Sequence, residues 1–597
     1  MRRGLLIAGA LLVAWRGVAA QADTGPPRPP APGADSTVVQ TPDSLARDTL
    51  ERYLPAFAAA IAPGPLARGF RSSYDVDSLV FSNITTLGDL LAHIPGVYVA
   101  RGGWFGAAEI AVYGGHGPLG LELYWDGLPY LPLGRDSVWL DPARVPIAPL
   151  ERIDIEVRAS MLRVYLVSAR PRSTVPRTEV RISTGGNSIA QYRGGFSKRW
   201  RSGLGLSLSA DYRNIDGITG TSTTAFNSTD LWLKAEYVPS ARFGISYQIV
   251  SSAWNRAAEG TLVDGWKQRR TDGILRAFVA LRDDGLGPRL GLTVARSQAS
   301  KDSLVQDRSL YQAILDLSET RSRASAGVTV RVQDAARPFQ VEARAAWQPL
   351  PFMSIAANAR RAHYGDKGHG NRAQVSGGLQ LPLGLSARGE VSWFEDFQAP
   401  VVRSDTFQRA TDFAAFVRWD LLRGRVTLEA GEIRRDPFQP SDFAAGIRPV
   451  ASLGPLPHST YATAFVALRP LSGLQLSGWY FDPITGGGDF EPPTHGRVSI
   501  AFYSKFWRVY KSGVFALRGE VAAESWSGSN LGGRDSTGAQ VPMRPATFVE
   551  TNIEMRIAEF TAYWMTRNYN GMRGSYVTGL GYPKHAQYYG VQWFFRN

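Results

Sequence analysis

The side chains best suited to chemistry in this sequence are its 7 histidines, because the chain contains no cysteine. Without cysteine there is no disulfide, no thiolate metal site and no thiol nucleophile. His363, Asp366 and His369 come closest to metal-ligand spacing, in the segment HYGDKGHGN. The glycines of this segment are typical of a turn, so we expect a loop here and no metal site.

Serines are frequent, but no Gly-x-Ser-x-Gly motif and no catalytic pair of carboxylates stands out. We therefore predict that the protein is not an enzyme and has no catalytic residue and no cofactor. The formal net charge of +14 suits nucleic acid, anionic lipid or an anionic ligand. Because the sequence has neither a basic run nor a nucleic-acid reader motif, we expect no nucleic-acid partner.

Residues 1–22, MRRGLLIAGALLVAWRGVAAQA, have the composition of an export signal. Arg2 and Arg3 precede an apolar run from Leu5 to Trp15, and small residues follow. The apolar run is well short of the ~20 residues that a membrane-spanning helix needs. We interpret the segment as a signal peptide, which predicts that the mature chain is exported.

Residues 177–597 consist of short segments in which apolar and polar residues alternate. In LGLSLSADYR, for example, Leu204, Leu206 and Leu208 share one face of an extended strand. We mark about 22 such segments, each on the order of 10 residues with aromatic residues near its ends, as in a transmembrane β-barrel. Closure into a barrel also pairs the backbone groups at every strand edge, which a bilayer requires.

A barrel of about 22 strands has a lumen wide enough to leak solutes, so we expect a domain that fills it. Residues 73–160 have the size of such a plug, with a helix predicted over 86–94 and several strands after it. The predicted fold class is an all-β transmembrane barrel of about 22 antiparallel strands with an N-terminal α+β plug domain in its lumen. The predicted divisions are a signal peptide (1–22), an extended linker (23–72), the plug (73–160), a connection (161–176) and the barrel (177–597).

Several plug residues have structural roles that follow from their types. Pro95 and Gly96 end a helix and turn the chain into a strand, and Asp126 and Gly127 form a tight turn between strands. We assign the following residues to the scaffold of the plug: Leu90, Leu91, Pro95, Gly96, Val97, Gly114, Asp126, Gly127, Glu151, Arg152 and Ile153.

Four segments of the plug occur in the order and spacing of a known family. They are TLGDLLAHIPGVYV (86–99), AEIAVYGG (108–115), ELYWDGLPY (122–130) and PLERIDIEV (149–157). Together they resemble the plug motifs of the TonB-dependent receptors of outer membranes, in which a plug sits inside a 22-stranded barrel. The resemblance implies location in the cell outer membrane of a Gram-negative-type bacterium, beside lipid and lipopolysaccharide.

The resemblance also implies where a ligand and a partner would bind. By motif position, ligand would meet the outer loops of the plug, and the contact candidates are Arg101, Trp104, Phe105, Tyr130 and Arg135. Packing of Trp104 and Phe105 against the barrel wall is an equal alternative. The segment DSTVVQTP resembles the box that pairs with a TonB-type energising protein in the periplasm, with Thr37, Val38, Val39 and Thr41 as candidates.

Three segments depart from the family pattern. Val112, Tyr113 and Gly114 stand where the family has Ile-Arg-Gly, and Arg158, Ala159 and Ser160 stand where it has Arg-Gly-Pro. The segment that follows, MLRVYLVSARP, is shorter than its counterpart and lacks its glycines.

These features leave two functions open. The first is energised import of a scarce ligand, such as a siderophore, cobalamin, haem or an oligomeric nutrient, by a monomeric receptor. The alternative is a plugged outer-membrane barrel without TonB coupling that acts as a passive pore, a surface-binding protein or an assembly protein. The shortened segment after the plug and the short loops favour the alternative, whereas a working box would favour import.

Overall fold

The fold was analysed in a computed structural model of the chain. The structure describes residues 54–57, 69–75, 84–101, 109–114, 116, 120–133, 140–215, 226–257, 266–300, 308–334, 338–365, 368–397, 407–439, 455–486, 493–506, 509–510, 514–528, 537, 539, 541–577, 580–582 and 585–596.

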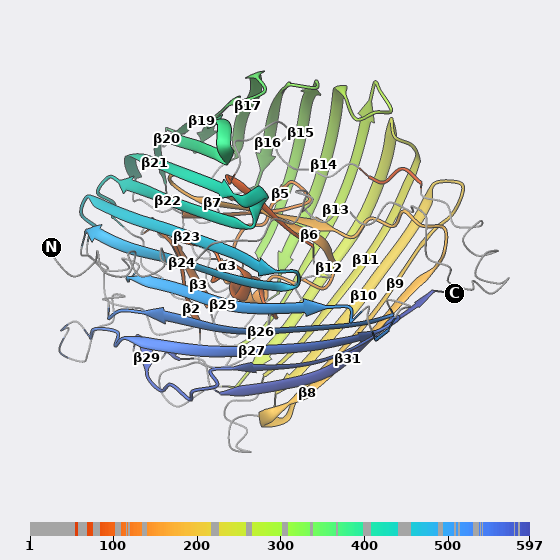
Figure 1. Cartoon of the computed structure of the whole chain (residues 1–597). Helices are drawn as coiled ribbons and strands as arrows, with labels where there is room; N and C mark the ends of the chain where they lie inside the picture. Colours follow the sequence, from red (N-terminus) through yellow and green to blue (C-terminus); the bar gives the residue numbers. More distant parts are fainter. Residues whose placement is uncertain are drawn as a thin grey trace.

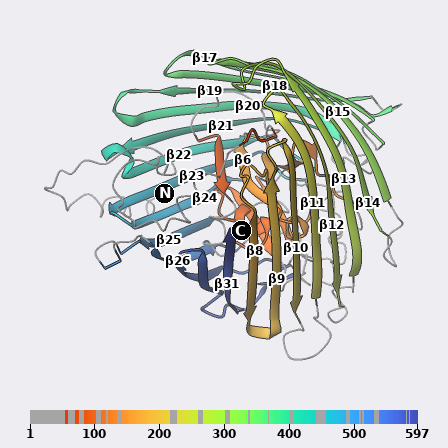
Figure 2. The ribbon, with the colours of Figure 1, turned by 90° about the vertical axis from the view of Figure 1, so that its right-hand side faces the viewer.

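A closed barrel of 22 antiparallel strands surrounds the rest of the molecule, as the alternating segments predicted (Figures 1 and 2). Its first and last strands, β8 and β31, pair with each other and close the ring. The barrel strands are β8 (Arg177–Gly185), β9 (Ile189–Arg199), β10 (Leu204–Ile215), β11 (Phe226–Ser240), β12 (Phe243–Arg256), β13 (Trp266–Ala280), β14 (Gly287–Ala299), β15 (Arg308–Thr320), β16 (Ala324–Gln333), β17 (Phe339–Leu350), β18 (Met353–His363), β19 (His369–Gln380), β20 (Leu385–Phe397), β21 (Phe407–Leu421), β22 (Val426–Arg435), β23 (Ser459–Leu471), β24 (Leu474–Thr485), β25 (His495–Ser504), β26 (Phe515–Trp526), β27 (Ala546–Ile557), β28 (Phe560–Arg567) and β31 (Ala586–Arg596).

The alternation along each strand separates an apolar outer face from a polar lumen. On β10, Leu204 and Leu208 are 45% and 40% exposed on the outside, whereas Ser207 between them is fully buried in the lumen. Neighbouring strands repeat this pattern, so apolar side chains form a belt around the barrel. Exposure of so large an apolar surface to water is unfavourable, whereas a lipid bilayer supplies a matching apolar environment.

The plug lies inside this ring (Figures 1 and 2). Its main sheet has the strand order β1-β6-β7-β4-β5, in which β4 and β7 run parallel and the other pairs are antiparallel. A separate hairpin pairs β2 with β3. The plug elements are β1 (Arg71–Asp75), α3 (Leu87–Leu91), β2 (Val97–Arg101), β3 (Glu109–Tyr113), β4 (Leu121–Trp125), β5 (Leu128–Pro129), the 3-10 helix η3 (Pro142–Arg144), β6 (Leu150–Val157) and β7 (Leu162–Ser168).

The sheet of the plug extends beyond both boundaries that we expected from the sequence. It begins at Arg71, within the predicted linker, and ends at Ser168, within the predicted connection 161–176. The segment after Ser160 is the strand β7, and all of its residues are buried. A strand that is covered on both faces need not alternate polar and apolar residues. In LRVYLVS only Arg163 and Ser168 are clearly polar, so the segment did not show the period of two that marks the barrel strands.

The predicted helix over 86–94 is shorter in the structure. α3 spans Leu87–Leu91, and Thr86 caps it in a capping box with Asp89. After Leu91 the chain makes tighter turns, with hydrogen bonds from His93 N–H to the Leu90 carbonyl and from Ile94 N–H to the Leu91 carbonyl. Pro95 disfavours a helical conformation at the residue before it, which ends the helix early.

The two rims of the barrel differ in the length of their connections. At the rim where the plug enters β8, several hairpins have two-residue turns, such as 241–242, 351–352, 472–473 and 558–559. The opposite rim carries longer segments, among them 436–458 and 527–545. We call these the inner rim and the outer rim. Among the described residues, no helix has the length and apolarity to cross a membrane, a finding that does not concern crossing by strands.

Candidate functional site: the interface between plug and barrel

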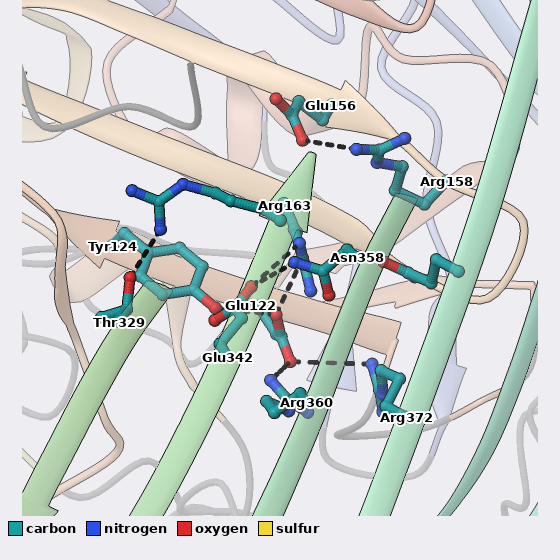
Figure 3. A network of polar contacts seen from close by, with 12 residues as sticks. Glu122, Tyr124, Glu156, Arg158, Arg163, Thr329, Glu342, Asn358, Arg360 and Arg372 are labelled. Atoms are coloured by element: carbon teal, nitrogen blue, oxygen red, sulfur yellow. Dashed lines mark hydrogen bonds and ion pairs between the residues drawn. The ribbon is translucent and has the colours of Figure 1, made fainter. Parts of the chain in front are cut away.

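Ion pairs and hydrogen bonds link the plug to the barrel wall at many of the described residues. Within the described part of the chain, no group of three or more histidine, aspartate or glutamate side chains is placed to hold a metal ion. The polar contacts gather where β4 and β7 of the plug face strands β16–β20, and Figure 3 shows this network. They decide how firmly the plug is held, so this interface is the candidate site.

Glu122 of β4 lies at the centre of the network (Figure 3). Its carboxylate accepts hydrogen bonds from Arg360 Nη1 of the barrel at 2.6 Å and from Arg163 Nε of the plug at 3.1 Å, and Arg372 Nη1 lies 3.6 Å away. Burial opposes ionisation, but these three guanidinium groups outweigh it and hold the pKa of Glu122 well below its usual range. Glu122 is therefore a charged tie between the plug and two barrel strands.

Tyr124 and Glu342 extend the network. Burial, reinforced by the negative charge of Glu122, raises the pKa of Tyr124 to about 12, so its hydroxyl keeps its proton and donates to Glu122 at 2.9 Å. On the barrel, Glu342 accepts from Arg331 at 2.8 Å and Asn358 at 2.6 Å. Arg163 Nη1 lies 3.6 Å from Glu342 and so bridges the plug and barrel carboxylates.

The three residues at which the last motif departs from the family pattern all meet the barrel. Arg158 Nη1 donates to Glu390 of β20 at 2.9 Å, and the backbone N–H of Ala159 donates to the same carboxylate at 3.0 Å. The hydroxyls of Ser160 and Ser392 lie 2.7 Å apart. The end of β6 is thus held by side chain and backbone at once.

Tyr113, the other departure, also contacts the barrel wall. Its hydroxyl donates to the Arg158 carbonyl at 2.9 Å, and the Arg435 guanidinium lies 4.8 Å from its ring centroid. Gly114 follows in the left-handed region, with a φ of 55°, and a Cβ there would lie 2.4 Å from Arg435 Nε. At this contact the positive charge is on the barrel and the aromatic ring is on the plug.

Asp126 ties the turn between β4 and β5 to the barrel near the inner rim. Its carboxylate accepts from Gln248 Nε2 at 2.7 Å and from the Ser168 hydroxyl at 2.6 Å, and Arg276 Nη1 lies 3.8 Å away. Burial opposes ionisation, yet Arg276, Lys234 and the hydrogen bonds hold the pKa of Asp126 below its usual value. The sequence assigned Asp126 to a tight turn, and its φ of 48° and the φ of 87° at Gly127 show one.

The remaining scaffold residues also take up structural positions. Leu90, Leu91 and Ile153 are fully buried in the plug core, and Val97 is buried with them. Glu151 accepts from Arg170, and Arg152 donates to Asp154 at 3.0 Å. Gly96, with a φ of 83°, follows Pro95 at the start of β2.

Of the ligand-contact candidates, Tyr130 is described in full. It is 6% exposed, and the Arg270 guanidinium covers its ring at 3.6 Å from the centroid. Contact between Tyr130 and a ligand therefore requires movement of Arg270. Arg101 is the last residue of β2. Trp104, Phe105 and Arg135 lie outside the described residues, as do the box candidates Thr37, Val38, Val39 and Thr41.

Sequence reasoning missed the barrel side of this interface. Arg276, Arg360 and Arg372 each face the lumen from a different strand, and each meets a plug residue more than 100 positions away in the chain. The available signal is that arginines recur at inward-facing strand positions. That signal shows which side chains face the lumen, but it does not show which plug carboxylate each one meets.

The interface holds the plug through two kinds of contact. Its polar ties are ion pairs and hydrogen bonds, and one apolar cluster also joins plug residues such as Trp125 to barrel residues such as Trp232 and Val250. The plug is therefore attached to the barrel wall by polar and apolar contacts together.

The architecture is similar to that of solved receptors and transporters. No family model and no curated protein sequence matches the chain. Three similar structures are the ferric enterobactin receptor PfeA of Pseudomonas aeruginosa (TM-score 0.67, 10% identity, covering 89% of this chain and 98% of that one), the siderophore receptor PirA of Acinetobacter baumannii (0.66, 9%, 88% and 98%) and the copper transporter OprC (0.68, 10%, 88% and 100%).

At these identities the likeness shows the fold. The chain has the plugged 22-stranded barrel fold of these receptors and transporters, which is the fold that its resemblance to the TonB-dependent receptors implied. The likeness covers nearly the full length of each matched structure, so plug and barrel are compared together.

Proposed function

We propose that the protein is a TonB-dependent outer-membrane receptor that imports a scarce ligand by energised movement of its plug. The observation that carries the proposal is a folded plug held in the lumen of a 22-stranded barrel, in part by ion pairs that can separate, such as Glu122 with Arg360 and Asp126 with Arg276. The similar structures include a ferric enterobactin receptor, a siderophore receptor and a copper transporter.

The energising partner would be a TonB-type protein in the periplasm, which would pair with the box around Val38 and Val39 as an added strand. The ligand would be a siderophore, cobalamin, haem or an oligomeric nutrient that enters at the outer rim, with Arg101, Trp104, Phe105, Tyr130 and Arg135 as contact candidates. We further propose a monomer surrounded by outer-membrane lipid and lipopolysaccharide.

The test is binding of the purified full-length protein in detergent to the periplasmic domain of the organism's energising protein. We expect saturable binding that is lost in Val38→Pro, because proline cannot donate the backbone hydrogen bond that an added strand needs. Thr24→Pro, outside the box, is the matched control and should bind as the wild type does. No binding at any attainable concentration would overturn the proposal and favour a plugged barrel without TonB coupling.

A further inference from the structure

Residues 54–57 precede the plug sheet and lie against the inner wall of the barrel. The Leu54 N–H donates to the Arg172 carbonyl at 2.9 Å. The carbonyl of Pro55 accepts from Arg199 Nη2 at 2.9 Å, and that of Phe57 accepts from Arg170 Nη1 at 3.1 Å. Three backbone groups in four residues are therefore bonded to the connection after the plug and to the end of β9.

The side chain of Phe57 strengthens this attachment. Only 1% of it is exposed, and it packs with Val238 and Phe278 of the barrel wall. Its ring meets that of Phe278 edge to face, with centroids 4.9 Å apart. The Arg276 guanidinium lies over the Phe57 ring at 4.7 Å from the centroid. The apolar packing of Phe57 and the Arg276 guanidinium over its ring hold the segment against the barrel wall.

Arg276 also faces the plug. The same guanidinium that covers Phe57 lies 3.8 Å from the carboxylate of Asp126. Asp126 opens the turn between β4 and β5, and the chain then runs through Tyr130 to Leu133. Leu133 packs against Ala299 and Leu310, at the outer-rim ends of β14 and β15. Arg276 thus joins the segment before the plug to a strand that leads to the outer rim.

We propose that residues 54–57 form a clip that fastens the segment before the plug to the barrel wall, and that release of Phe57 loosens the Asp126 turn through Arg276. The proposal deepens the proposed function, because it names the first contact that a pull from the periplasm would break. A pull on any residue before Leu54 reaches Phe57 before it reaches β1, since the contacts follow one another along the chain. The clip is therefore loaded first and the plug second.

The link from the clip to the turn is electrostatic. While Phe57 covers Arg276, the guanidinium is shielded from water and its attraction to Asp126 is strong. Once Phe57 leaves, water reaches Arg276 and weakens that attraction. Lys234, Gln248 and Ser168 remain beside Asp126, so the turn is loosened rather than broken.

Hydrogen exchange of the full-length protein in detergent tests this link without ligand or partner. In Phe57→Ala we expect the amides of Asp126, Gly127, Leu128 and Tyr130 to exchange about tenfold faster than in the wild type. Phe70→Ala is the matched control, because Phe70 is equally buried but lies over Arg158 and Arg388 instead. Unchanged exchange in Phe57→Ala, or equal acceleration in both variants, would overturn the proposal.

A second variant separates the two halves of the proposal. Arg276→Gln removes the shared charge and keeps the apolar seat of Phe57. We expect faster exchange at the amides of Asp126, Gly127, Leu128 and Tyr130 while the amide of Leu54, which donates to the Arg172 carbonyl, stays protected. If residues 126–130 keep the wild-type exchange rate, Arg276 does not link the clip to the turn.

Force measurement tests the order of release. When the full-length protein in a bilayer is pulled by its N-terminus, we expect a first, small extension from the clip before the plug extends, and loss of that first step in Phe57→Ala. A single step of equal force in both proteins would overturn the clip. Because these tests use no energising protein, failure of partner binding would overturn the proposed function alone, and failure here would overturn the clip alone.

Discussion

At the scale of single residues, the plug places carboxylates in a buried interface and pairs them with basic groups of the barrel. Glu122 and Asp126 are the two clearest examples, each held by side chains from strands far away in the sequence. A buried charge that loses its partners costs far more than an exposed one. The stability of the plug in the lumen therefore depends in part on whether these few carboxylates keep all of their basic partners.

The substitution Asp126→Ala tests this dependence. It removes the acceptor of Gln248 and the counter-charge of Lys234 and Arg276, and it leaves those positive charges buried. We expect the free energy of plug opening to fall by about 3–5 kcal/mol, measured by native-state hydrogen exchange of β4 and β7. Asp284→Ala is the control, because Asp284 pairs with Arg282 in an exposed turn and should change nothing measurable. Similar effects of the two substitutions would contradict the pairing argument.

His116 makes the interface between plug and barrel sensitive to pH. Its Nε2 lies 2.7 Å from Asp412 Oδ2 of the barrel, and its ring is buried against Phe394 and Phe438. Burial lowers the pKa of His116; Arg435 lowers it further, and the carboxylate of Asp412 opposes both. The neutral ring then carries its proton on Nε2 and donates to Asp412.

The sign of the pH effect follows from this lowered pKa. A histidine that is harder to protonate in the folded state stabilises that state fully above its unfolded pKa of about 6.5 and loses this stabilisation as the pH falls through the lowered value. We expect residues 109–114 to open more readily at about pH 5 than at about pH 7.5. Hydrogen exchange, corrected for its intrinsic pH dependence, measures this. His116→Gln keeps a donor for Asp412 and should abolish the difference; a difference that persists in this variant would assign it to another group.

Asp126 shows how far the sequence predicts the role of a single residue. The sequence identified Asp126 as a turn residue, and the structure confirms the turn, but its second role at the barrel wall depends on Arg276 and Gln248. Those partners lie more than 100 positions away, and only the fold brings them together. The local sequence indicates which backbone conformation a residue needs. The partner of a side chain across the interface leaves no pattern in the local sequence.

At the scale of elements, the turn between β4 and β5 needs a glycine. Asp126 and Gly127 both have positive φ values, 48° and 87°, the combination of a type I′ hairpin turn. We expect Gly127→Ala to destabilise the plug by about 1–2 kcal/mol, because a side chain disfavours the left-handed region. Gly186→Ala, in the hairpin between β8 and β9 where a Cβ would meet nothing within 4 Å, should be neutral. Chemical denaturation followed by tryptophan fluorescence compares the two, and equal midpoints would contradict the prediction.

Strands were predicted well where one face meets water or lipid and poorly where both faces are covered. The barrel strands showed their period of two in the sequence, and the count of about 22 is confirmed. β7 was interpreted as part of a connection, because Leu162–Ser168 is apolar nearly throughout. A strand between two others inside a plug has no polar face to reveal it.

At the scale of the whole molecule, we predicted the closed barrel and the domain inside its lumen from physical requirements rather than from motifs. A sheet of this size in a bilayer must hide its edges, and a lumen of this width must be blocked. The position of the plug against the barrel wall depends on many side-chain contacts at once. For this reason the clip at Phe57 and the cover of Arg270 over Tyr130 could not be read from the sequence.

The apolar belt around the barrel carries the last prediction, which concerns the whole molecule in its membrane. Leu292 faces outward near the middle of β14, and Gln298 faces outward near its outer-rim end. Leu292→Arg places a charge in the hydrocarbon and should cost about 2–4 kcal/mol in folding into phospholipid vesicles, whereas Gln298→Arg near the headgroups should cost about 0–1 kcal/mol. Denaturant titration of vesicle-inserted protein measures both. Equal costs at the two depths would mean that the belt does not lie across the hydrocarbon, and the barrel would then need another environment for its apolar face.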